Sequence, residues 1–164
     1  MEPWLRSQLQ WANLFSFFLR DHSSKSIVFL SGGIGVTPFR SMVKYATDKQ
    51  LLLKTTVFDS NRNQENILYK REFDECLSEN KNLKIIYTIT DEIQESPSLP
   101  SDDWKGERGF INKAMITKYM SPNELENSLY YICGPSSMLN AMQKLLQDIQ
   151  IPKERIMIEE FTGY

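Results

Sequence analysis

The chain has 164 residues, of which 41% are hydrophobic and 24% charged, and its formal net charge is −2. These values are ordinary for a single soluble domain with its own core, and they exclude a strongly basic protein that binds nucleic acid or an anionic membrane surface. Its two cysteines, Cys76 and Cys133, are too few for a disulfide framework, a cysteine zinc site or an iron–sulfur cluster, so a reducing, cytoplasmic setting is expected.

Residues 1–25 are strongly apolar but lack the pattern of a membrane span. Their longest uninterrupted apolar run is residues 17–19, and Arg6 and Arg20 bracket the segment. The basic start and small-residue cleavage site of a signal peptide are also missing. The single histidine, His22, stands in a polar turn without the neighbours that a catalytic triad or a metal site needs. The apolar side chains of this segment are Trp4, Leu5, Leu9, Trp11, Leu14, Phe15, Phe17, Phe18 and Leu19.

A glycine-rich turn follows. The apolar run at residues 27–30 predicts a strand buried on both faces, and the glycines after it allow a sharp turn close to a ligand. Thr37 suits a helix N-cap and Pro38 the first helical position, and apolar residues then recur at helical spacing. A strand, a glycine turn and a helix N-terminus in succession are typical of a pyrophosphate site. Pro38, however, stands where the dinucleotide fingerprint has its third glycine. The alternative is that the turn has only a structural role. The expected pyrophosphate contacts are Gly32, Gly33, Gly35, Val36, Thr37 and Pro38.

The rest of the chain alternates between strand and helix patterns. Strands are predicted over residues 51–58, 83–89, 129–133 and 155–161, and helices over 65–79, 111–119 and 135–149. Residues 90–108 are expected to form a loop, and Ser121 to cap another turn. Such alternation predicts an α/β, doubly wound parallel sheet of five strands with helices on both faces. Ligands of such sheets bind beyond the carboxyl ends of the strands, where residues 32–38, 59–62, 90–91 and 133–135 fall.

Three motifs occur in a fixed order: Gly-Gly-x-Gly-x-Thr-Pro at residues 32–38, Cys-Gly-Pro-x-x-Met at 133–138 and Glu-x-Phe at 159–161. Together they resemble the nicotinamide-binding domain of ferredoxin–NADP reductase-type flavoproteins. The resemblance covers residues 26–164 and implies a Rossmann-like domain that binds NAD(P)H and presents the nicotinamide to FAD. The family's flavin-binding barrel normally precedes this domain, and these 164 residues are not expected to contain it. Residues 1–25 are therefore expected to be a remnant of that barrel or a contact to a flavin domain or protein.

The resemblance implies roles at the nicotinamide end of the site. Cys133 is expected near the carbon that gives up hydride, where it assists by packing and polarity. Glu159 is expected to position the reacting groups, and Phe161 to cover the flavin, with Tyr164 as a rival. On residue type alone, Cys133 and Phe161 would be core residues. The neighbouring residues expected to contact the cofactor are Gly134, Pro135 and Met138.

At the adenosine end, the polar turn after the second strand is the expected ribose contact. Its residues are Asp59, Ser60, Asn61 and Arg62. Arg62 suits a 2′-phosphate, as an arginine fork does. Phosphate-specific members of the family carry Ser-Arg after the third strand, whereas this chain has Thr90-Asp91, whose carboxylate would repel a phosphate. NADH is therefore expected to be preferred weakly to NADPH.

The sequence leaves three functions open. The first is the NAD(P)H-binding part of an electron-transferring flavin oxidoreductase. The second is a non-catalytic dinucleotide-binding module. The third is the nucleotide-binding subunit of a split flavin reductase whose flavin domain docks on residues 1–25.

Overall fold

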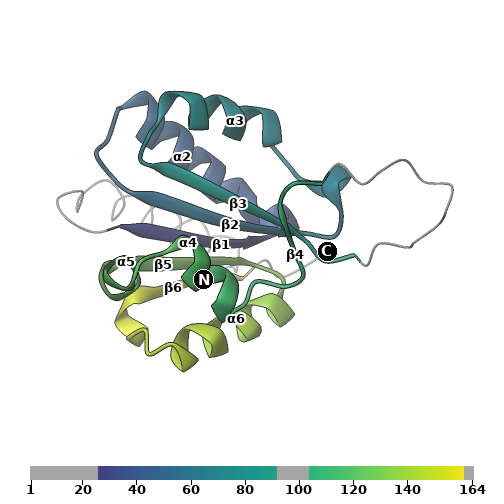
Figure 1. Cartoon of the computed structure of the whole chain (residues 1–164), viewed down its shortest axis with the longest axis vertical. Helices are drawn as coiled ribbons and strands as arrows, with labels where there is room; N and C mark the ends of the chain where they lie inside the picture. Colours follow the sequence, from purple (N-terminus) through teal and green to yellow (C-terminus); the bar gives the residue numbers. More distant parts are fainter. Residues whose placement is uncertain (1–25, 92–103, 161–164) are drawn as a thin grey trace, which may run out of the picture.

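The computed structural model describes residues 26–91 and 104–160, which form one parallel sheet of six strands in the order β4-β3-β2-β1-β5-β6 (Figure 1). The strands are β1 (Ile27–Gly32), β2 (Thr55–Asn61), β3 (Leu83–Ile89), β4 (Glu107–Arg108), β5 (Leu129–Gly134) and β6 (Ile156–Glu160). The helices are α2 (Thr37–Asp48), α3 (Lys70–Glu79), α4 (Lys113–Tyr119), α5 (Pro122–Asn127) and α6 (Ser136–Asp148). Short 3₁₀ helices are η1 (Gly33–Val36), η2 (Gln64–Asn66) and η3 (Lys153–Arg155).

Helices cover both faces of the sheet, as the alternating pattern predicted. Figure 1 shows α2 and α3 above the sheet and α4, α5 and α6 below it. Successive side chains of a strand point to opposite faces, so β1 supplies both cores. Phe29 packs with α2, where its ring stacks on Phe39 at a centroid distance of 4.3 Å. Val28 and Leu30 pack with Ile116 and Leu146 on the opposite face. The α/β, doubly wound class is therefore confirmed.

The sheet has six strands, so the expected count of five was wrong. The sixth, β4, has two residues and lies in the stretch expected to be a loop. It pairs in parallel with β3, and Gly109 N–H donates to the Ile89 carbonyl at 2.8 Å. The Thr88 hydroxyl donates to the Gly109 carbonyl at 2.5 Å. A strand of two residues is too short to show a hydrophobic period, which is why the sequence pattern missed it.

Several element boundaries also differ from the expected ones. The second strand begins at Thr55, where pairing with Ile27 starts, and Leu52 before it is 91% exposed. The expected helix over 65–79 is divided into η2 and α3, because Tyr69 between them has a left-handed backbone with φ 56°. The last strand ends at Glu160.

The start of α2 was also predicted one residue late. Its N-cap is Val36, so Thr37 is the first helical residue and makes no capping hydrogen bond. The preceding turn is taken up by η1, which leads directly into α2. Pro38 still lies in the first turn, where its missing N–H has no cost.

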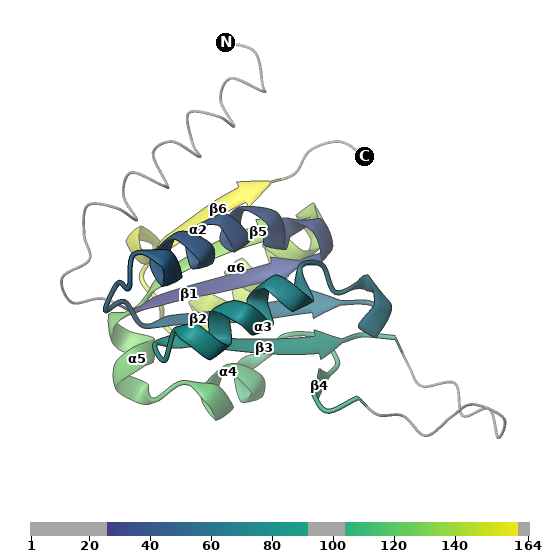
Figure 2. The same cartoon turned by 90° about the horizontal axis from the view of Figure 1, so that it is seen from above.

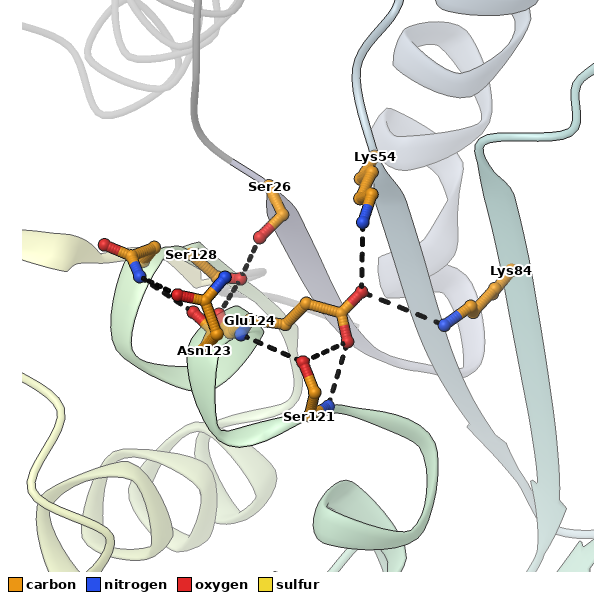
Figure 3. A network of polar contacts seen from close by, with 8 residues as sticks. Ser26, Lys54, Lys84, Ser121, Asn123, Glu124 and Ser128 are labelled. Carbon is orange, nitrogen blue, oxygen red and sulfur yellow. Dashed lines mark hydrogen bonds and ion pairs between the residues drawn. The ribbon is translucent and has the colours of Figure 1, made fainter.

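The amino ends of the strands are held by a polar network around Glu124 (Figure 3). Ser121 and Glu124 form a capping box at the start of α5, which confirms the predicted cap. One Glu124 carboxylate oxygen lies 3.9 Å from the ammonium groups of both Lys54 and Lys84. The hydrogen bond from the Ser121 backbone, with these cations, holds the pKa of Glu124 below its usual value. This network therefore ties α5 to the starts of β2 and β3. No helix in the described ranges is long and apolar enough to cross a membrane.

Candidate functional site

The polar stretches predicted to form the site lie at one edge of the sheet. The arrowheads of the parallel strands point the same way in Figure 2. The pairing places Gly32 opposite Ser60, and Ser31 opposite Cys133. Strand order reverses at β1, which lies between β2 and β5, while α2 and α6 leave toward opposite faces. This is the switch point at which open α/β sheets bind ligands.

Two glycines of the loop have different steric surroundings. Gly33 has φ +54°, and a β-carbon added to it would meet nothing within 4 Å. A β-carbon on Gly35 would lie 2.2 Å from the Cys133 carbonyl oxygen and 2.6 Å from its carbon. Gly33 therefore provides the turn and an open surface, whereas Gly35 lets η1 pack directly on the end of β5.

Met138 fills the space between the two strand ends. A β-carbon on Gly32 would lie 2.4 Å from the Met138 sulfur, and one on Gly134 would lie 3.0 Å from it. Met138 stands in the first turn of α6, whose N-cap is Pro135 without a side-chain cap. The motifs at residues 32–38 and 133–138 are thus in contact with each other, as a single site requires.

A row of polar side chains crosses five strands near this edge. The register aligns residues Tyr87, Asp59, Ser31, Cys133 and Glu159 of β3, β2, β1, β5 and β6. They share the face covered by α2 and α3, because they alternate with residues of the opposite core. Ser31, Asp59 and Cys133 are fully buried, and Glu159 is 8% exposed. Two ionisable carboxyl groups and a thiol therefore lie in the interior beside the switch point.

Burial raises the pKa values of ionisable groups in this row of polar side chains. It raises the pKa of Glu159 to about 7 and that of the Cys133 thiol to about 12, the latter with a smaller contribution from the Glu159 charge. Cys133 is consequently a neutral thiol at physiological pH, unsuited to act as a nucleophile. Glu159 exchanges its proton near neutral pH. Within residues 26–91 and 104–160, no group of three or more His, Cys, Asp and Glu side chains is placed to hold a metal ion.

The expected adenosine contacts are divided between interior and surface. The Asn61 side chain is buried and donates from Nδ2 to Asp59 Oδ2 at 2.9 Å. Arg62 is exposed, and its carbonyl accepts the N–H groups of Thr90 and Asp91 at 3.2 and 2.8 Å. Arg62 and the exposed Asp91 are thus neighbours at the ends of β2 and β3. Ser60 is half-buried beside Gly32.

Sequence reasoning missed two aromatic residues at this edge. Phe110 follows β4 and is 75% exposed, while Gly109 before it has φ +86° and is bonded to β3. The signal available in the sequence was the pair Gly109-Phe110, which directly precedes the apolar residue Ile111. The Tyr69 hydroxyl lies 3.4 Å from Thr37 Oγ1. Phe161 and Tyr164 lie outside the described residues.

Comparison with known sequences gives consistent relatives. Residues 29–144 match the family described as the oxidoreductase NAD-binding domain. The chain is 34% identical over 152 residues to a subunit of the Na(+)-translocating NADH-quinone reductase of Methylococcus capsulatus, covering 90% of this chain and 35% of the relative. It is 30% identical over 154 residues to the protein of the same name in Haemophilus influenzae (strain 86-028NP), covering 91% and 35%. The chain therefore spans about a third of the length of these curated relatives.

Two solved structures illustrate the shared fold. Flavohemoglobin from Malassezia yamatoensis, with bound FAD and heme, matches with a TM-score of 0.71 at 23% identity, covering 89% of this chain and 34% of that one. Ferredoxin-NADP+ reductase from Plasmodium falciparum matches with a TM-score of 0.58 at 19% identity, covering 84% and 52%. At these identities the likeness shows a common architecture.

Proposed function

The chain belongs to the oxidoreductase NAD-binding domain family, and from that premise we propose that it binds NAD(P)H and presents the nicotinamide to a flavin held by another domain or chain. The resemblance to ferredoxin–NADP reductase-type flavoproteins is confirmed by this match and by the structural neighbours. Bound NADH would supply a hydride to a flavin held outside this chain, which is the chemistry that the two cofactors would provide. The residues of this chain bind, orient and shield the dinucleotide.

One observation carries the proposal: the motifs lie along the edge in the order that an extended dinucleotide requires. From β3 to β6 the edge presents Asp91, Arg62, the glycine turn, Cys133 and Glu159. Neighbouring strands are about 4.8 Å apart, so four spacings give roughly 19 Å, on the scale of an extended dinucleotide. Adenosine would therefore lie over β3 and β2, pyrophosphate over β1, and nicotinamide over β5 and β6.

The glycine turn fits a pyrophosphate. Neither η1 nor α2 has a side-chain N-cap, but Thr37 N–H is bonded to the Ile34 carbonyl and Pro38 has no N–H, so the N–H groups proposed to bind the anion are those at the start of η1. The open space around Gly33 lets a phosphate approach the backbone. Thr37 at the start of α2 adds a hydroxyl donor. Backbone donors at Gly32, Gly33 and Gly35, followed by Val36, Thr37 and Pro38, form the proposed cradle.

At the nicotinamide end, Cys133 and Glu159 are the proposed catalytic residues, with Phe161 beyond the described part. The Cys133 thiol is neutral and fully buried, so its proposed contribution is packing and weak polarity in the layer beneath the reacting carbon. The Glu159 carboxyl can hold or release a proton at neutral pH. Pro135, Gly134 and Met138 close the side of the site formed by α6, and Tyr164 is a second candidate for aromatic stacking.

At the adenosine end, Phe110 offers an exposed ring on a backbone anchored to β3, a geometry suited to stacking on adenine. Ser60, Arg62, Thr90 and Asp91 would contact the ribose, and the Asp91 carboxylate favours NADH over NADPH. The curated relatives named above extend well beyond the part that this chain matches, which fits a flavin held either by another domain or by another chain.

The experiment that tests the proposal is calorimetric titration of the chain with NADH, followed by NADH:ferricyanide turnover with and without FAD. Binding with turnover once FAD is added supports an enzyme whose flavin lies outside this chain, and a co-purifying yellow partner protein supports the split reductase. Binding without turnover under any of these conditions supports a non-catalytic module, and absence of binding contradicts the proposal.

A further inference from the structure

Asp59 joins the ends of the two strands that frame the proposed dinucleotide site. The Ser31 hydroxyl at the end of β1 donates to Asp59 Oδ1 at 2.8 Å, and Asn61 Nδ2 at the end of β2 donates to Oδ2 at 2.9 Å. Ser31 immediately precedes Gly32, and Asn61 immediately precedes Arg62. One buried carboxylate therefore fixes the start of the pyrophosphate turn relative to the start of the adenosine turn.

The same cluster contains an unused acceptor. Asn61 Oδ1 is buried and has no hydrogen-bond partner among the described residues, although Asn61 as a whole is only 4% exposed. A protonated Asp59 could no longer accept from Asn61 Nδ2 on its protonated oxygen. Rotation of the Asn61 amide would bring Oδ1 to that oxygen as an acceptor, so the bond within β2 would survive protonation, and Oδ1 of Asp59 would still accept from Ser31 of β1.

We propose that Asp59 is a positioning residue that holds the pyrophosphate and adenosine turns together, and that it takes up a proton when a pyrophosphate binds. This inference rests on the proposed function. A pyrophosphate diester carries two negative charges, and it would bind at the turn that begins one residue after Ser31. Like charges disfavour ionisation of a buried carboxyl, so binding and protonation support each other.

The groups that bond to Asp59 within the described residues are neutral. Burial raises its pKa to about 6, although the hydrogen bonds from Ser31 and Asn61 oppose the change. Tyr87 is its neighbour on β3, with Lys70 and Asp74 of α3 near that ring. On the other side the row continues to Cys133 and Glu159. The side chains of α2 that pack on this face are apolar: Phe39, Met42, Val43 and Ala46.

The test is titration with ADP-ribose from pH 5.5 to 8 in two buffers of different ionisation enthalpy. ADP-ribose has the pyrophosphate and both riboses but no nicotinamide, which separates Asp59 from Glu159, and its diester phosphates do not titrate in this range. If binding raises the pKa of Asp59 by about one unit, we expect proton uptake of roughly half a proton near pH 6.5 and about sevenfold weaker binding at pH 8 than at pH 5.5. Binding without proton uptake would overturn the proton linkage.

Two substitutions of Asp59 distinguish the effect of its charge from its role in positioning the two turns. Asp59→Asn keeps both hydrogen bonds once the Asn61 amide rotates, so it should abolish proton uptake and tighten binding at pH 8 about tenfold. Asp59→Leu removes the tie and should weaken ADP-ribose binding at every pH. If Asp59→Leu fails to fold, Ser31→Ala removes one of the two hydrogen bonds and should give a smaller loss.

A matched control is Asp48→Asn at the exposed end of α2, which should retain the wild-type pH profile. An Asp59→Asn protein with the wild-type profile would contradict the linkage. Equal binding by Asp59→Leu, or by Ser31→Ala in its place, would contradict the positioning role. Failure of the wild-type chain to bind ADP-ribose at any pH would overturn the proposed function itself, and this inference with it.

Discussion

Gly35 packs against the backbone of Cys133 so closely that a β-carbon on residue 35 would stand 2.2 Å from the Cys133 carbonyl oxygen. The contact joins the glycine turn after β1 to the end of β5, and thus the pyrophosphate part of the proposed site to the nicotinamide part. The obstructing atoms belong to the backbone of a central strand, which cannot move aside as a flexible side chain could. The glycine is therefore required by the fold itself.

This contact separates the effects of two glycine substitutions. Gly35→Ala should destabilise the protein by about 2 kcal/mol or more, because it overpacks the junction of η1 and β5. Gly33→Ala should cost only about 1 kcal/mol, since its left-handed backbone is the sole penalty and its β-carbon enters open space. That β-carbon would stand where the pyrophosphate approaches, so NADH affinity should fall in a folded protein. Thermal unfolding and calorimetry of both variants measure this, and unchanged affinity in Gly33→Ala would contradict the cradle.

The two cysteines should be almost unreactive in the native protein. Both are buried, and burial raises the pKa of each thiol, that of Cys133 to about 12. Since the thiolate is the reactive species, an aromatic disulfide reagent at pH 8 should label neither quickly. The unfolded chain in guanidinium chloride should release two equivalents at once. Rapid labelling of Cys133 in the native state would show that this thiol is more exposed and more acidic than its position in the polar row implies.

The sequence pattern predicted the strands and helices around this site, but it did not predict which of their residues lie next to one another. The alternation of apolar runs and helical faces was enough to predict every strand of five or more residues. The strand β4 and the left-handed Tyr69 escaped, because neither two residues nor one backbone dihedral angle leaves a periodic signal.

The polar row also escaped for a physical reason. Asp59, Ser31 and Cys133 are adjacent only because β2 and β5 both pair with β1 in one particular register. Strand order and register depend on crossovers and packing of the whole domain, so a local pattern shows that each residue ends a strand but not which residues meet. Asp59 illustrates the consequence: expected near the ribose, it lies buried with both carboxylate oxygens hydrogen-bonded.

Stability should depend on pH through Glu159. Burial raises its pKa from 4.5 to about 7, so between these values the folded protein binds more protons than the unfolded chain. The free energy of unfolding contributed by this group therefore falls as pH rises from 4.5 to 7, by roughly 2–3 kcal/mol. Glu159→Gln should remove this decline and stabilise the protein at pH 7.5. Urea unfolding at several pH values measures the effect, and an identical pH dependence in the variant would contradict it.

Phe110 should contribute to binding through the adenine ring alone. Aromatic stacking on a base is worth about 1 kcal/mol or more, so Phe110→Ala should weaken AMP, ADP-ribose and NADH binding by a similar factor, about fivefold. Phe110→Tyr should retain most of the affinity. Leu52→Ala is a suitable control, since Leu52 is the most exposed large apolar residue of the described part and lies at the opposite edge of the sheet. Loss of NADH binding with unchanged AMP binding would place Phe110 elsewhere in the site.

Nucleotide preference should depend on the opposed charges of Arg62 and Asp91. Two backbone N–H groups, those of Thr90 and Asp91, bond to the Arg62 carbonyl and hold the two exposed side chains at neighbouring strand ends. A 2′-phosphate placed there would meet one cation and one carboxylate, so NADPH should bind more weakly than NADH by a modest factor. Asp91→Ser should improve NADPH affinity about tenfold, by about 1.4 kcal/mol, and leave NADH affinity almost unchanged.

Arg62→Gln should have the opposite effect, weakening NADPH while NADH changes little. Because the carboxylate and the guanidinium act on the same phosphate, the improvement from Asp91→Ser should shrink when Arg62 is also replaced, which a double-mutant cycle measures. Because Arg62 and Asp91 are exposed, salt screens their interactions with a 2′-phosphate. The difference in affinity between NADPH and NADH should therefore narrow as the salt concentration is raised from about 50 to about 500 mM. Tighter binding of NADPH than NADH by the wild-type chain would show that Arg62 outweighs Asp91 and would reverse the assigned preference.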